Sequence, residues 1–62
     1  MNEIWTGRDN DNNAFTVKVK PGTDTMVVWK FADNLLGLLG WSKISVIMKG
    51  DLLGAPLLNP ND

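Results

Sequence analysis

The sequence predicts a small α+β domain, in which one helix covers one face of an antiparallel or mixed sheet of three or four strands. Two observations predict it. Residues 14–20 alternate apolar and polar side chains, which is typical of a strand with one buried face. Residues 26–40 repeat their apolar side chains at the spacing of a helix. A chain of 62 residues is long enough for one domain only, so we expect a single domain over residues 1–62.

The first part of the chain predicts a β-hairpin. Residues 2–6 form a short alternating pattern, and we expect a first strand there. The next residues, 7–13, are Gly-Arg-Asp-Asn-Asp-Asn-Asn, and Asn and Asp favour turns because they tolerate left-handed backbone. We therefore expect a solvated hairpin loop between this strand and the strand at 14–20.

The strand at 14–20 separates its side chains by face. Phe15, Val17 and Val19 share one face, and the other face is polar. This pattern predicts a sheet with one covered face and one face in water. Pro21 and Gly22 end the strand, because proline presets the first position of a turn and glycine accepts a positive φ at the second.

The segment 26–40 decides between fold classes. On a helical wheel, one apolar set falls within an arc of about 100° and one set of polar and glycine residues falls in the opposite third. The apolar set is Val28, Phe31, Ala32, Leu35 and Leu39, and the second set is Lys30, Asp33, Asn34, Gly37 and Gly40. We expect a helix that begins after a capping residue among positions 23–25 and ends near Gly37 or Gly40. If the first half is a strand instead, the alternative fold is a small all-β barrel or meander.

A further strand is predicted at residues 43–49. Its alternation places Ile44, Val46 and Met48 on the face toward the helix. The same alternation places Ile47 on the opposite face, among polar side chains.

The last part of the chain predicts less regular structure. Residues 52–62 contain leucines interrupted by glycine and proline, which favours an irregular segment that packs its leucines on the core, with or without a short edge strand. We expect residues 59–62 to be frayed.

Two stretches carry a family resemblance. The first is Thr-Val-Lys-Val-Lys-Pro-Gly-Thr-Asp-Thr at residues 16–25, and the second is Ile-Ser-Val-Ile-Met-Lys-Gly at residues 44–50, followed by Asp-Leu-Leu-Gly. In this order of strand, Pro-containing turn, Thr-capped helix and apolar strand, the chain from Phe15 to Gly50 resembles the ubiquitin-like family. The resemblance implies a β-grasp fold, in which Ile47 takes the place of the family's exposed partner-binding isoleucine.

The chain departs from that family toward its C-terminal end. Residues 58–62 are Leu-Asn-Pro-Asn-Asp rather than a Gly-Gly tail, so conjugation to targets and sulfur transfer are not expected. In that family the last strand lies at the centre of the sheet, and this chain is too short to contain a clear one. One strand edge would then stay open to pair with another chain.

These patterns predict a partner-binding surface on the sheet face opposite the helix. We expect it to carry Ile47 and four lysines, Lys18, Lys20, Lys43 and Lys49. The expected function is a non-catalytic protein–protein interaction module that acts through this face or through an open strand edge. One alternative is a small structural or assembly subunit of a viral or other oligomeric particle, and another is an amphipathic protein at a membrane surface.

Several chemistries lack the residues they need. The chain has no Cys and no His, so we expect no enzyme, no cofactor and no small-molecule substrate. Asp9, Asp11 and Asn13 have the alternating spacing of calcium ligands. However, Ala14 stands where the turn glycine is needed and Lys20 where the closing glutamate is needed, so no metal site is expected.

Net charge and hydropathy limit the classes of partner that we expect. Six basic and seven acidic residues leave a net charge of −1, which argues against nucleic-acid binding. We expect no membrane span and no secretory signal, because the apolar runs are too short and the first residues are not basic. The expected partner is another protein or a second copy, in the cytoplasm of the source or a host cell or inside a viral particle.

Overall fold

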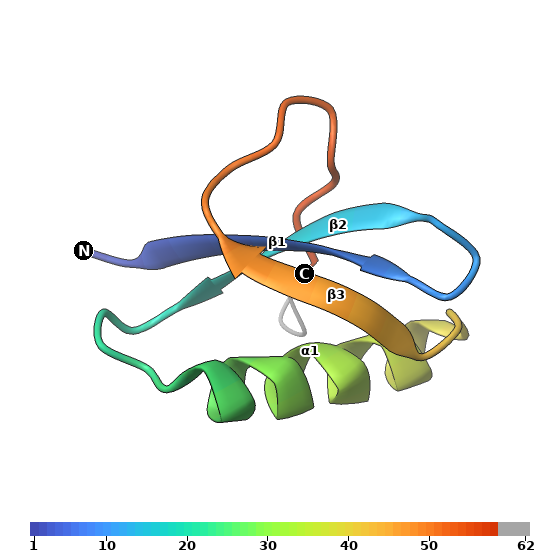
Figure 1. Ribbon diagram of the computed structural model, residues 1–62, viewed down its shortest axis with the longest axis horizontal. Helices are drawn as coiled ribbons and strands as arrows, with labels where there is room; N and C mark the ends of the chain where they lie inside the picture. Colours follow the sequence, from blue (N-terminus) through green and yellow to red (C-terminus); the bar gives the residue numbers. More distant parts are fainter. Residues whose placement is uncertain (59–62) are drawn as a thin grey trace.

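The computed structural model describes residues 1–58, which form a three-stranded sheet with one helix along one face (Figure 1). The elements are β1 Glu3–Asp9, β2 Ala14–Val19, α1 Thr25–Leu39 and β3 Ile44–Lys49. The strand order is β2-β1-β3, and β1 is antiparallel to both neighbours. The two edge strands are therefore parallel to each other, and α1 connects them across one face. This confirms the predicted α+β class and is compatible with a β-grasp-like fold. The fraying predicted for residues 59–62 lies outside the described residues.

The β1–β2 hairpin has a shorter loop than the sequence predicts. Gly7 and Arg8 were expected in the loop, but both pair with β2 as part of the ladder. The chain turns over residues 10–13, where Asn12 has a φ of 68°. Asparagine tolerates this left-handed conformation, which explains the Asn-rich sequence of the turn.

α1 ends at the glycine that the sequence singles out. Gly40 has a φ of 78°, and its N–H donates to the Gly37 carbonyl at 3.2 Å, while the Trp41 N–H donates to the Leu36 carbonyl at 2.9 Å. These two bonds form a Schellman motif, which satisfies carbonyls that the helix leaves unpaired. At the other end, Asp24 occupies the N-cap position, but its side chain makes no capping hydrogen bond.

One core cluster joins the sheet, the helix and the tail. The Phe15 ring meets the Trp41 ring edge to face, with ring centroids 6.4 Å apart. Leu58 packs into the same cluster, whereas the other leucines of residues 52–57 are exposed. The buried apolar residues are Trp5, Phe15, Val17, Val28, Ala32, Leu35, Leu36, Ile44 and Leu58. Leu39 was expected in this core and is exposed.

β3 contains a register shift that reverses part of the predicted face assignment. Arg8 of β1 pairs with Val46, but its neighbour Asp9 pairs with Ile44, so Ser45 is an extra residue on β3. Ile44 and Ile47 therefore both face the helix side, where Ile47 packs against the core. The prediction that Ile47 lies on the outer face is wrong.

Val46 and Met48 take the opposite places to those predicted. Met48 pairs with Thr6, and Val46 pairs with Arg8. Between these two pairs lies the pair Gly7 and Ile47, which faces the helix. Since successive residues of a strand face opposite sides, Met48 and Val46 lie on the outer face. Both apolar side chains are exposed. The prediction that they pack beneath the helix is wrong, because strict alternation takes no account of the extra residue.

Candidate interaction surface

β3 is the open edge of the sheet. Among residues 1–58, its backbone pairs with β1 on one side and with no strand on the other. The Gly50 N–H donates to the Ile4 carbonyl at 2.8 Å, so Gly50 and Ile4 form a hydrogen-bonded pair. Along an antiparallel ladder, hydrogen-bonded pairs alternate with pairs whose backbone groups point away from each other. The backbone groups of Ile47 and Lys49 therefore point away from β1, along the free edge.

The opposite edge of the sheet, β2, is partly covered. The Thr16 N–H donates to the Pro56 carbonyl and the Leu58 N–H donates to the Thr16 carbonyl, both at 2.8 Å. Thr16 and Leu57 form a single parallel bridge, so the short edge strand considered for this segment is reduced to one residue pair. The tail thus occupies the middle of the β2 edge, and β3 offers the longer uncovered run of backbone within residues 1–58.

Apolar side chains accompany the free edge on the outer face of the sheet. Val46 is 40% exposed and Met48 is 61% exposed. They lie two residues apart on β3 and so project side by side from the same face. An extended segment pairing with β3 would cover both of them.

A helix flank continues this surface on the inner side. Met26, Trp29 and Asp33 line one shallow groove with Thr25 and Lys30. The Ile44 N–H donates to the Asp33 carboxylate at 3.4 Å, which places this flank of α1 on the β3 side. Trp29 and Asp33 are four residues apart and share that flank. Met26 is 77% exposed and Trp29 is 40% exposed, so the groove is apolar and open to solvent.

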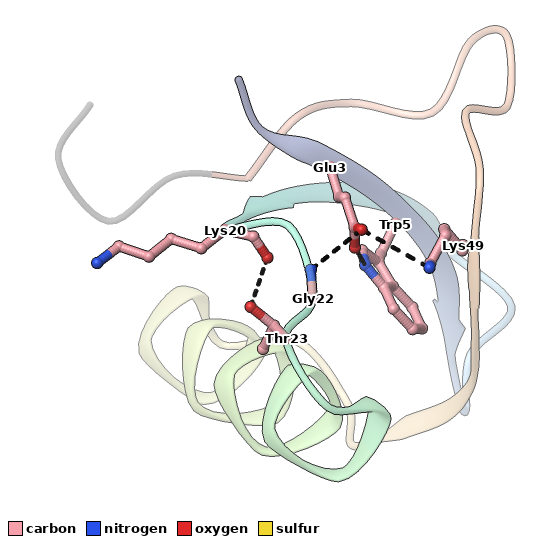
Figure 2. A network of polar contacts seen from close by, with 6 residues as sticks. All are labelled: Glu3, Trp5, Lys20, Gly22, Thr23 and Lys49. Atoms are coloured by element: carbon pink, nitrogen blue, oxygen red, sulfur yellow. Dashed lines mark hydrogen bonds and ion pairs between the residues drawn. The ribbon is translucent and has the colours of Figure 1, made fainter.

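A polar network fixes the end of β3 against β1 (Figure 2). The Glu3 carboxylate accepts hydrogen bonds from the Trp5 indole N–H and the Gly22 N–H, both at 3.2 Å. Lys49 Nζ lies 3.7 Å from Glu3 Oε2 and 5.6 Å from the centroid of a Trp5 ring. The pKa of Glu3 lies below its ordinary value of 4.5. The hydrogen bond from the Gly22 N–H contributes most to this lowering, followed by the Trp5 N–H and the charge of Lys49.

The carboxylate of Asp9 is used inside the hairpin turn. Oδ1 accepts the backbone N–H groups of Asp11 and Asn13, at 3.0 and 2.7 Å, and Oδ2 accepts the Asn13 side-chain amide at 3.1 Å. Burial raises the pKa of Asp9, but these hydrogen bonds outweigh it and leave the pKa below the ordinary value of 3.8. The residues with the spacing of calcium ligands thus form a turn, in which N–H groups of the chain itself donate to the Asp9 carboxylate.

The predicted binding residues do not gather on one face. Lys18 pairs with Ile4 on the outer face, whereas Ile47 and Lys49 lie on the helix side. Lys20 and Lys43 are exposed and lie outside the strands. Only Ile47, Lys49 and Lys43 are near the free edge. Met26 and Trp29 were missed as surface residues, because a helical wheel does not show which flank lies beside β3.

Comparisons with protein-family models, curated proteins and solved structures find no match for this chain. The candidate surface therefore rests on the geometry of the chain itself. No helix within residues 1–58 is long and apolar enough to cross a membrane.

Proposed function

We propose that the protein is a non-catalytic interaction module that binds an extended segment of a protein partner along the free edge of β3. The observation that carries this proposal is the outward direction of the Ile47 and Lys49 backbone groups, which have no strand beside them within residues 1–58. Such groups are a template for another strand, because each N–H and C=O can pair with a main chain.

The side chains around the edge support the same function. A strand added to β3 would contact Val46 and Met48 on the outer face and approach the Met26–Trp29 groove on the inner face. Main-chain hydrogen bonds would supply affinity, and these apolar contacts would select the partner's side chains. Cytoplasmic or particle location stays a prediction from the sequence.

Peptide selection followed by chemical-shift mapping tests this function. Random peptides displayed on phage are selected on the immobilised protein, and the recovered peptides are titrated into the isotope-labelled chain. We expect amide shifts to concentrate on residues 45–49 and on the indole of Trp29. Recovery of no binding peptide by the monomeric chain, or shifts confined to the β2 edge, would contradict the proposal.

Two proline variants sharpen the test. Lys49→Pro removes an outward N–H from the β3 edge and keeps every backbone hydrogen bond to β1, and we expect peptide binding to be lost. It also removes the Lys49 side chain from Glu3 and Trp5, so Lys49→Ala, which keeps the N–H, is the control for that loss. Lys18→Pro is the matched control, because Lys18 lies in a non-hydrogen-bonded pair with Ile4, on the β2 edge. We expect Lys18→Pro to keep peptide binding.

A further inference from the structure

We infer that the strand bound by β3 is the β3 strand of a second copy of this chain, so that two molecules form a symmetric dimer with a continuous six-stranded sheet. This inference rests on the proposed function, because it uses the same free edge. A two-fold axis requires the two strands to run antiparallel. The outward backbone groups of β3 permit only a few registers for such pairing.

The register is set by which residues have outward backbone groups. An axis through Ile47 pairs Ile47 with its own copy as a hydrogen-bonded pair, since its N–H and C=O point outward. Val46 then lies opposite Met48 of the second copy, so the two exposed apolar side chains meet twice across the axis. Moving the axis to Val46 would instead place Ile47 opposite Ser45 of the second copy, the extra residue of β3, where the ladder with β1 is already irregular.

Charge complementarity favours the Ile47 axis over that alternative. Counting outward from Ile47, Lys49 falls opposite Ser45 of the second copy. Lys43, which directly precedes β3, then lies toward the Gly50–Asp51 end of the second copy, with the offset set by the extra residue Ser45. The two-fold axis repeats the Lys43–Asp51 approach at both ends of the paired strands. No pair of lysines is opposed in this register.

The helix flank supplies contact area that strand pairing alone does not. A stable interface buries about 1,600 Å² in total, more than one short strand provides. α1 lies on the same face in both copies, and its Met26–Trp29 flank is on the β3 side. Pairing of the two β3 edges therefore turns the two apolar flanks toward each other, with the Ile47 side chains beneath them.

Sedimentation velocity over a concentration series tests the dimer. We expect the wild-type mass to approach twice the 6.8 kDa of one chain as concentration rises. Lys49→Pro is expected to be monomeric throughout, whereas Lys18→Pro, on the opposite edge, is expected to dimerise like the wild type. Lys49→Ala keeps the N–H and is expected to dimerise, which separates the backbone donor from the side chain. Circular dichroism confirms that each variant is folded.

A charge exchange tests the register without proline. Lys43→Asp places a carboxylate beside Asp51 of the second copy at both ends, and we expect the dimer dissociation constant to rise about 2- to 30-fold. The double variant Lys43→Asp with Asp51→Lys restores opposite charges and should recover wild-type affinity. Failure of the double variant to recover it would overturn the Ile47 axis.

The outcomes separate this inference from the proposed function. A chain that stays monomeric at millimolar concentration while selected peptides shift residues 45–49 overturns the dimer and leaves the module standing. A dimer that survives Lys49→Pro but is lost in Trp29→Glu overturns strand pairing in favour of a helix interface. A monomer that selects no peptide overturns both.

Discussion

The ring of Phe15 lies against Gly7, its paired neighbour across the β1–β2 ladder. A Cβ at position 7 would lie 2.8 Å from Phe15 Cζ and 2.4 Å from the Val46 carbonyl oxygen. The second contact is with backbone, so it cannot be relieved by rotating a side chain. Glycine at this position lets the ring and both neighbouring strands approach.

Gly7→Ala is therefore expected to lower the free energy of unfolding by about 1–3 kcal/mol, as in other overpacked cores. Urea denaturation followed by tryptophan fluorescence measures this change. Gly37→Ala is the control, because no atom in the described part of the chain lies within 4 Å of a Cβ there and alanine favours a helix. We expect Gly37→Ala to raise stability by up to about 1 kcal/mol, and equal effects of the two variants would contradict the crowding at Gly7.

Ile47→Asp is expected to destabilise the fold rather than only to weaken binding. Ile47 packs against the core, so a carboxylate there would lose apolar contact and part of its hydration. We expect a loss of about 2–4 kcal/mol from the free energy of unfolding. At concentrations where the chain is monomeric, Met48→Asp, on the exposed outer face, is expected to change stability by less than about 0.5 kcal/mol. Chemical denaturation of the two variants distinguishes the inner from the outer face.

The fold could be predicted where local chemistry and tertiary structure agree. The alternation of Phe15 and Val17, and the glycine after Leu39, follow from steric rules that act within a few residues. The faces of β3 could not be predicted, because the register shift at Ser45 depends on pairing with β1.

The candidate surface was predictable only in part. An open strand edge follows from the small number of strands, and among residues 1–58 β3 has one. Which edge stays open depends on the bond between Thr16 and Pro56, forty residues apart, and no local pattern encodes that contact. The exposure of Trp29 likewise depends on how α1 is rotated over the sheet.

Gly40→Ala is expected to destabilise the protein through the helix end. The φ of 78° at this position suits glycine, and a side chain there costs about 1–2 kcal/mol in an L-residue. No atom of the described residues 1–58 lies within 4 Å of a Cβ at Gly40, so the cost comes from backbone conformation. Gly40→Asn should recover part of the loss, since asparagine accepts this conformation. Thermal unfolding of the three proteins gives the order glycine, asparagine, alanine if this explanation holds.

Acid is expected to destabilise the protein through Asp9. The pKa of Asp9 is lower in the folded chain than its ordinary value of 3.8, because Asn13 and Asp11 donate to the carboxylate. The folded state therefore binds this proton more weakly than the unfolded chain does, so its stabilisation is present above about pH 4 and is lost as pH falls through the folded pKa.

Asp9→Asn isolates that contribution. The amide cannot accept all three hydrogen bonds, so we expect lower stability at neutral pH and a smaller further loss on acidification to about pH 2. Asp24→Asn makes the same substitution at a carboxylate that forms no capping hydrogen bond, and it serves as the matched control. Denaturation midpoints measured across this pH range compare the three slopes. An unchanged slope in Asp9→Asn would assign the acid sensitivity to another carboxylate, of which Glu3, with its own lowered pKa, is the first to replace by Gln.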